Sequence, residues 1–477
     1  MSTRAVTFPT HLRPMAARRP VARAVASVVV GMGLIALGAL GGLSAPAQAE
    51  NLVEVLDAAK AYDAAYLAAR AQAESVTYQA EQARALKRPS VNLQAGINRS
   101  HLDSSVGRLT NPLTGASTNY SSSATNRKVG VGARQPLYNP GNSAKVDQAE
   151  QSLIAADADL LNATNDLTVR VTQAYFDVLG AQDVLTTAQA NKAALAEQLA
   201  AAKRSFEVGN STITDTREAQ ARFDLASAQE IAATNDLRVK RIALDQLVGR
   251  TDVKPTPLRT PVNLDSLSPG QVEDWVGQAA TAPSVRKAEV GLQVASLEID
   301  KARAGHLPTV DAVANVARND ISTTNPTAKV SGGAGTSSSI GLELNMSLYA
   351  GDATQNRIRE VLRLKEKAEH DVDNARRSVT LGTRQAYFGV QSGLAQVKAY
   401  EAAEASAKLA LEATQLGYRV GVRINKDVLD AQTQLASTQK DLYKARYDVI
   451  VGSVKLRQAS GTLKADDLGE LNKLLVN

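Results

Sequence analysis

The sequence predicts a mainly α-helical chain with a membrane β-barrel contribution: long coiled-coil hairpins together with four transmembrane β-strands per chain. Three observations predict this class. Two proline-free stretches carry apolar or small residues at a seven-residue spacing, four other segments alternate apolar and polar residues, and the whole pattern occurs twice. Each proline-free stretch, at about 67 residues and 1.5 Å per residue, would span roughly 100 Å, which is too long for one globular core.

Residues 1–49 are predicted to be a secretory signal peptide. Four arginines precede an apolar run that ends near Leu43, and Ala47-Gln48-Ala49 forms a cleavage site before Glu50. The adjacent arginine pair leaves a twin-arginine export signal as an alternative. The segment holds five arginines and no acid, so its removal lowers the formal charge from +6 to +1. Nucleic acid is therefore not expected among the partners.

The rest of the chain offers little reactive chemistry. It has no cysteine, and its histidines, His101, His306 and His370, lie far apart without the spacing of a metal site. No nucleophile–base set and no phosphate-binding loop can be recognised, so neither an enzyme nor a cofactor is expected. No run of about 20 apolar residues follows Glu50, so no transmembrane helix is expected either.

The chain repeats its plan at an offset of 212 residues. The sequence QAYF at residues 173–176 recurs at 385–388, and FEVG at 206–209 corresponds to YRVG at 418–421. An internal repeat of this length indicates a duplicated architecture. The predicted division is a first repeat, residues 50–270, a second repeat, residues 271–461, and a C-terminal tail, residues 462–477.

Each repeat is expected to hold a shorter helix, a long helix and a returning helix. The long helices end at Gly209 and Gly421, where glycine followed by polar capping residues indicates a tight turn into an antiparallel helix. Small residues on the seven-residue seam would let the paired helices approach closely. The expected helices are residues 52–86, 142–208, 215–248, 272–305, 353–419 and 426–460.

Four segments between the helices alternate apolar and polar residues, which is typical of strands with one apolar face. They are long enough to cross a bilayer when tilted. Tyr138 and Tyr349 stand at the exits of the second and fourth segments, where aromatic rings suit a membrane–water interface. Loops rich in Ser, Thr, Asn and Gly are expected at residues 101–126 and 319–338. The expected strands are residues 91–98, 129–134, 310–317 and 340–348.

Four strands cannot form a membrane sheet alone, because open edges are not tolerated in lipid and small barrels need about eight strands. Several chains must therefore share one barrel. Three copies would supply 12 strands, whereas two would supply eight and leave no wide lumen. The alternative is a soluble β-sandwich, for which the long helices supply no second sheet.

These landmarks, taken in order, resemble the TolC family of outer-membrane efflux proteins. The matching sequences are RPSV and LPTV, PLYNPG and SLYAGD, QAYF twice, and VGNSTITD with VGVRINKDVLDA. The resemblance covers nearly all of the chain after Glu50. It implies a homotrimer in the outer membrane, with a 12-stranded barrel continuous with a periplasmic helical tube. It also implies a passive exit duct for an efflux pump or a type I secretion system, working with a periplasmic adaptor protein and an inner-membrane pump.

The resemblance further implies roles for the second helix turn, which would lie at the periplasmic tip of the tube. Asp427 and Asp430 would form acidic rings around the entrance. Being three residues apart they share a helix face, and threefold symmetry would bring six carboxylates around one axis, where they attract cations. Links between the inner and outer helix pairs would keep the idle tube closed until the adaptor opens it. The residues implied in these links, here named the latch residues, are Thr214, Asp215, Tyr418 and Arg423.

Alternatives to these roles stay open. An acid near a helix N-terminus is favourable by itself, which would explain Asp215 and Asp427 without any ring. Lys426 stands where the family often has an apolar residue, and it would weaken the negative ring or change its selectivity. The alternative function is a coiled-coil structural or adhesive protein of the cell envelope, which would not explain the duplicated strand pairs. The cargo, whether drug, metal or protein, is not identified by these residues.

Overall fold

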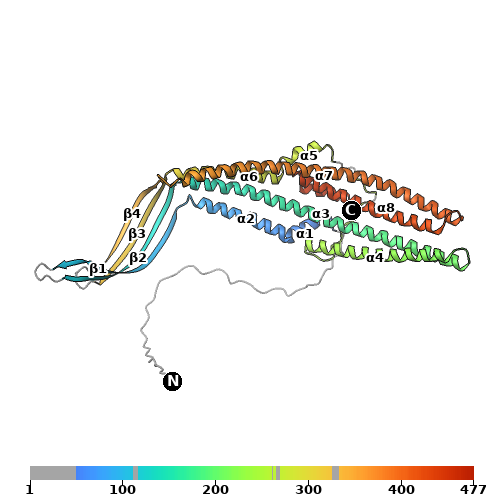
Figure 1. Cartoon of the computed structure of the whole chain (residues 1–477), viewed down its shortest axis with the longest axis horizontal. Helices are drawn as coiled ribbons and strands as arrows, with labels where there is room; N and C mark the ends of the chain where they lie inside the picture. Colours follow the sequence, from blue (N-terminus) through green and yellow to red (C-terminus); the bar gives the residue numbers. More distant parts are fainter. Residues whose placement is uncertain (1–49, 111–116, 260, 265–268, 325–331, 477) are drawn as a thin grey trace, which may run out of the picture. The chain divides into compact units, whose positions relative to one another are not determined.

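The computed structural model describes residues 50–110, 117–259, 261–264, 269–324 and 332–476 (Figure 1). The predicted signal peptide lies outside these residues. A short 3-10 turn, Ala304–His306, precedes the third strand. The elements are α1 (Leu52–Tyr62), α2 (Ala64–Ala85), β1 (Ser90–Thr110), β2 (Ser117–Tyr138), α3 (Pro140–Glu207), α4 (Ile213–Val248), α5 (Val272–Ala279), α6 (Pro283–Arg303), β3 (Thr309–Thr324), β4 (Gly333–Asn345), α7 (Ala353–Arg419), α8 (Asn425–Ala459) and α9 (Ala465–Asn472). The predicted class of long helices with four strands is therefore confirmed.

The two long helices form where the seven-residue pattern predicts them. α3 has 68 residues and α7 has 67. Asn139 caps α3 by accepting a hydrogen bond from the N–H of Asn142, and Pro140 occupies the first turn. On α4 the buried residues Ala219, Ala226 and Ala233 are seven apart. These small side chains let α4 lie close along α3, and α8 likewise lies along α7.

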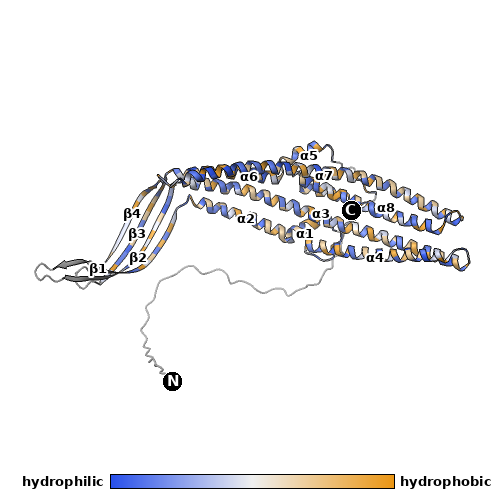
Figure 2. Ribbon diagram, viewed as in Figure 1, coloured by the Kyte–Doolittle hydropathy of each residue, from blue (hydrophilic) through white to orange (hydrophobic). Residues whose placement is uncertain are grey.

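The long helices are not covered on all sides within one chain. Figure 2 shows polar and apolar residues interspersed along α3 and α7. Leu381, Phe388 and Leu409 of α7 are more than half exposed. No helix in the described part of the chain is long and apolar enough to cross a membrane. Exposed apolar side chains of this kind mark surfaces that another chain can cover.

Two of the predicted helices are broken. The helix expected at residues 52–86 breaks at Asp63, which caps α2 by accepting from the N–H of Tyr66 and pairs with Arg170 of α3 at 2.9 Å. The helix expected at residues 272–305 breaks before Pro283, because proline suits the first turn of a helix and disfavours helical geometry in the preceding residue. The predicted C-terminal tail contains α9.

The four strands form one antiparallel sheet in the order β1-β2-β3-β4. Because directly opposed residues share a face, the register gathers most of the apolar residues of the four strands on one side. Val91, Leu93, Ile340 and Leu342 are each more than two-thirds exposed there. Within the described residues, β1 and β4 each have a strand neighbour on one side only. An apolar face and two open edges are both unfavourable in water.

The strands are longer than predicted. β1 reaches Thr110 and β2 begins at Ser117, inside the loop expected at residues 101–126, and β3 and β4 likewise enter the loop expected at residues 319–338. Strand pairing continues past the alternating segments because the hydrogen bonds between strands are made by the backbone and do not depend on the side chains. In the other direction β4 ends at Asn345, so Met346 and Leu348, predicted in the strand, lie in the connection to α7.

A buried core surrounds the middle of α3. Tyr175 is fully buried, and its hydroxyl donates to the Glu50 carbonyl at 3.0 Å and accepts from the Thr256 N–H at 2.8 Å. Burial raises the pKa of Tyr175 to about 12, so it stays a neutral donor. Leu468 and Leu471 of α9 belong to the same core. The two chain ends of the described region are thereby fixed to α3.

Glu298 of α6 links three helices. Its carboxylate accepts hydrogen bonds from Gln148 of α3 at 2.7 Å, from Lys301 at 2.8 Å and from Arg357 of α7 at 2.6 Å. Burial opposes ionisation of this group, but the three donors outweigh it and lower the pKa of Glu298 to about 2. The ionised carboxylate therefore stabilises the junction of α3, α6 and α7.

Replacing Glu298 with Gln is expected to lower the free energy of unfolding at pH 7 by about 1–2 kcal/mol, allowing for solvent screening. The folded-state pKa lies below the ordinary value of 4.5, so this stabilisation is present above pH 4.5 and lost as the pH falls toward 2. Thermal unfolding of the variant and the unmodified protein in detergent, at pH 7 and near pH 2, measures this stabilisation. Glu289→Gln, which removes an exposed α6 ion pair with Arg376, is the control. If both variants lowered the free energy of unfolding equally at pH 7, Glu298 would not be the group that stabilises the junction of α3, α6 and α7.

Candidate functional site

Both helical hairpins close through a glycine in the left-handed conformation. The φ angle is 79° at Gly209 and 83° at Gly421. Beyond them, the N–H of Asn210 donates to the Ser205 carbonyl at 2.8 Å and the N–H of Val422 to the Gly417 carbonyl at 2.9 Å. This bonding pattern satisfies the last carbonyls of a helix and requires a residue that tolerates positive φ. The two turns carry all the predicted site residues.

Of the two latch residues in the first turn, Asp215 is bonded within its own helix N-terminus. Asp215 accepts hydrogen bonds from the Thr212 hydroxyl at 2.7 Å, the Thr212 N–H at 3.0 Å and the Ser211 hydroxyl at 2.9 Å. These bonds, chiefly the one from the Thr212 hydroxyl, lower the pKa of Asp215. Thr214 is exposed. In the part of the chain that the structure describes, neither latch residue makes a hydrogen bond or ion pair with Tyr418 or Arg423.

Arg423 lies in the second turn beside Asp427. Its Nη1 is 3.5 Å from Asp427 Oδ2, and 63% of the side chain is exposed. A Cβ at Gly417 would lie 2.8 Å from Arg423 Cγ, so the aliphatic part of this side chain passes close over the Gly417 backbone. Tyr418 is half-buried next to it. The guanidinium is therefore held at the tip while most of its surface stays open to solvent.

Asp430 makes the closest ionic contacts of the two turns. Lys426 Nζ and Arg222 Nη2 each lie 2.6 Å from its carboxylate. The hydrogen bond from Lys426 is the main cause of a lowered pKa at Asp430, and the charge of Arg222 adds to it. Arg222 belongs to α4, so this contact joins the two hairpins of the chain. Two cations thus neutralise Asp430, whereas Asp427 has one partner at a longer distance.

The first turn of α8 is fixed against the first hairpin. Leu429 is fully buried and packs with Leu195 and Leu199 of α3 and Ala219 of α4. Asn425, also buried, accepts a hydrogen bond from the side chain of Gln198. Because Asn425 and Leu429 flank Asp427 and Leu429 precedes Asp430, these contacts set where the two acids point.

Sequence reasoning missed the second partner of Asp430. Lys426 and Asp430 are four residues apart, a spacing at which opposite charges meet on a helix, so their contact could have been predicted. Arg222 lies 208 residues away in the chain, and nothing in its sequence neighbourhood distinguishes it from the other cations of α4. The neutralisation of Asp430 comes from the packing of α4 against α8.

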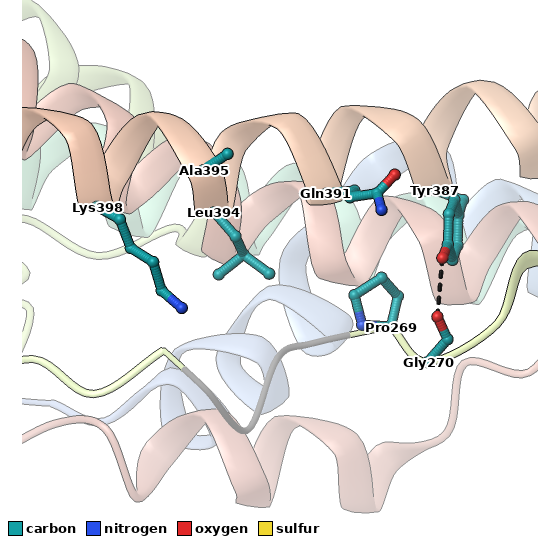
Figure 3. A pocket seen from close by; sticks show the side chains of 7 residues that line it. All are labelled: Pro269, Gly270, Tyr387, Gln391, Leu394, Ala395 and Lys398. Atoms are coloured by element: carbon teal, nitrogen blue, oxygen red, sulfur yellow. Dashed lines mark hydrogen bonds between the residues drawn. The ribbon is translucent and has the colours of Figure 1, made fainter.

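A metal site or a pocket would be the alternative to the two turns as a functional site. Among the residues that the structure describes, no three His, Cys, Asp or Glu side chains come together as a metal site. A recess of about 280 Å³ lies between α7 and the segment before α5 (Figure 3), where Tyr387 donates to the Gly270 carbonyl at 2.8 Å. Lys398 is the one charged residue of its lining. The recess offers no acid–base pair.

Comparisons with known proteins agree with one another. The sequence profile described as outer membrane efflux protein matches residues 55–250 and 278–462. The chain is 35% identical over 443 residues to outer membrane protein TolC of Vibrio cholerae, covering 92% of this chain and 97% of that protein. It is 32% identical over 340 residues to the alkaline protease secretion protein AprF of Pseudomonas aeruginosa, covering 70% and 69%. A crystal structure of a membrane protein from Pseudomonas aeruginosa shares the fold, with a TM-score of 0.72 at 20% identity over 88% of this chain and 92% of that one.

Proposed function

Because the chain belongs to the outer membrane efflux protein family, we propose that three copies form an outer-membrane channel that acts as a passive exit duct for an efflux pump or a type I secretion system. The observation that carries this proposal is the sheet. One face is apolar and exposed, and β1 and β4 each have an open edge in the described chain. Lipid covers such a face, and pairing with further copies closes such edges.

The trimer gives each structural feature a place. Three four-stranded sheets close into a barrel of 12 strands, with β4 of one copy beside β1 of the next. Each predicted repeat contributes two strands and one helical hairpin. The hairpins α3–α4 and α7–α8 of the three copies form a periplasmic tube, in which exposed side chains such as Leu409 become covered. A periplasmic adaptor binds this tube, and an inner-membrane pump supplies the energy.

The tip of the tube is closed at rest and opened by the adaptor. Within one chain the hairpins are joined through Arg222 and Asp430, while Arg423 is left exposed. We assign the partners of Arg423 and Tyr418 to the first-turn latch residues, Thr214 and Asp215, brought within reach by assembly. An exposed ion pair contributes about 0–1 kcal/mol, so a few such links in three copies sum to a few kcal/mol. A partner that prefers the open state can supply this amount.

Reconstitution of the full-length protein tests the proposed function. We expect detergent-dependent extraction from the outer membrane, a trimer that dissociates on heating, and discrete ion-conducting events in planar lipid bilayers. A monodisperse single chain in detergent-free buffer, or trimers that never conduct, would refute the channel. The envelope coiled-coil alternative predicts trimers without conductance, so the same measurement separates the two.

Replacing Arg423 with Ser is expected to raise the single-channel conductance about twofold or more, because the link that narrows the entrance is lost. Planar-bilayer recordings at fixed salt measure this change. Arg419→Ser, on the exposed last turn of α7 without a latch role, is the matched control and should leave conductance unchanged. Equal conductance of Arg423→Ser and the unmodified channel would remove Arg423 from the latch.

A further inference from the structure

Three arginines end the apolar face of the sheet. Moving away from the helices, the apolar residues on this face finish at Ile97 on β1, Val129 on β2 and Val316 on β3. Side chains alternate between faces, so the next residue on the same face is two positions further along each strand. Those three residues are Arg99, Arg127 and Arg318.

The register brings the three arginines next to one another. Arg127 pairs with Ile97 on one side and with Asp320 on the other. Arg99 and Arg318 are each two residues from these partners, so both are diagonal neighbours of Arg127. Diagonal neighbours in an antiparallel sheet lie about 7–8 Å apart, within reach of long side chains. The arginines therefore form one cluster across three adjacent strands.

The cluster carries excess positive charge. All three arginines are exposed. Arg127 is 3.7 Å from Asp320, and no ion pair joins Arg99 or Arg318 to any side chain that the structure describes. Lys128, the neighbour of Arg127 in sequence, points to the opposite, polar face. On each of the three strands the positive charge thus begins directly past the last apolar residue of this face. Arg318 lies opposite Val129 and Arg99 opposite Thr125, so the three arginines are staggered over four residues of strand, about 13–14 Å.

The position of the cluster fits the headgroups of the outer leaflet. β1 leaves α2 at Ser90 and extends away from the helices to Thr110 (Figure 1), so Arg99 lies near its middle, past the apolar residues of the exposed face. Two residues of strand advance about 6–7 Å, which is comparable to the thickness of one headgroup layer. Guanidinium groups bind phosphate through two parallel hydrogen bonds.

We propose that Arg99, Arg127 and Arg318 bind the phosphate groups of an outer-leaflet lipid, and that a headgroup with two phosphates fits the cluster best. This inference rests on the proposed outer-membrane barrel. Adjacent arginines of three strands can hold two phosphates at once, with one guanidinium shared between them. Three copies would place nine arginines in a belt around the barrel. The belt fixes the depth of the barrel in the membrane through its lipid contacts.

Binding of bisphosphorylated lipid A to the full-length trimer in detergent tests the site. The triple variant Arg99→Gln, Arg127→Gln, Arg318→Gln should bind this lipid at least about tenfold more weakly than the unmodified trimer. Lys128→Gln removes a cation from the same strand on the other face and should bind as the unmodified trimer does. Monophosphorylated lipid A should bind more weakly than the bisphosphorylated form, and inorganic phosphate at millimolar concentration should not displace the lipid.

Two results would overturn the inference: unchanged lipid affinity in the triple variant, or full displacement of the lipid by inorganic phosphate. If the triple variant fails to assemble, Arg99→Gln and Arg318→Gln singly should each weaken binding about threefold, and no effect of either would also refute the site. Conductance in planar bilayers is recorded on the same samples. Conducting trimers with unchanged lipid binding refute the lipid site alone, whereas trimers that never conduct refute the proposed channel.

Discussion

Gly461→Ala is expected to cost at least about 3 kcal/mol of folding free energy. Gly461 follows α8 with a φ of +71°. An added Cβ would lie 2.5 Å from the Cα of Ala282 and 2.9 Å from its Cβ, at the start of α6. Since the obstacle is backbone, no rotamer change can relieve it, and the end of α8 must move away from α6. Left-handed strain of about 1–2 kcal/mol adds to this clash.

Three other glycines with positive φ supply a graded set of controls. Gly249 occupies the equivalent position in the first half and has a φ of +73°, but its Cβ would meet the ring of Tyr62, which is more than half exposed and can swing aside. Gly421 and Gly209 have open space around the added Cβ. The expected order of destabilisation is Gly461→Ala, then Gly249→Ala, then the two turn variants at about 1 kcal/mol each.

Heat-stable trimer yield and the midpoint of thermal unfolding in detergent measure this order. We expect Gly461→Ala to reduce the trimer yield about tenfold or more, because the loss exceeds the usual effect of a surface substitution. A Gly461→Ala protein that unfolds at the same temperature as Gly421→Ala would mean that the contact with Ala282 is not maintained in the assembled protein.

Most of the fold can be predicted because the sequence contains three periodic patterns. The seven-residue seam, the alternation of apolar residues and the 212-residue offset each report a regular packing requirement. The predicted element boundaries are wrong where the structure depends on interactions that leave no periodic pattern in the sequence. Asp63 breaks a helix through a cap and a contact with Arg170, and the polar ends of the strands pair through backbone alone. Local patterns contain neither kind of interaction.

The candidate entrance is predictable to a smaller degree. Asp427, Asp430 and Arg423 can be located from the turn motif, and Lys426 can be paired with Asp430 from helical spacing. The position of Arg222 depends on how α4 packs beside α8, which a single sequence does not encode locally. That contact leaves Asp430 more strongly neutralised than Asp427. The difference between the two acids can be measured as a difference in ion selectivity.

Removing both acids with Asp427→Ala and Asp430→Ala is expected to lower the cation-to-anion permeability ratio about threefold or more, because six carboxylates near one axis attract cations. The single variants should differ. Asp430 is neutralised by Lys426 and Arg222 at 2.6 Å each, whereas Asp427 has Arg423 at 3.5 Å. Asp427→Ala should therefore account for most of the loss.

Lys426→Gln provides the converse test. It removes one of the two cations on Asp430 and leaves both acids in place, so the permeability ratio should rise about twofold above that of the unmodified channel. Arg423→Ser should raise the ratio as well, since it removes the cation that lies 3.5 Å from Asp427 within one chain. Reversal potentials in a salt gradient across planar bilayers measure all of these ratios. If Asp430→Ala lowers selectivity as much as Asp427→Ala while Lys426→Gln changes nothing, then Asp430 is not shielded in the working channel, and the contact between α4 and α8 at Arg222 opens when the trimer assembles.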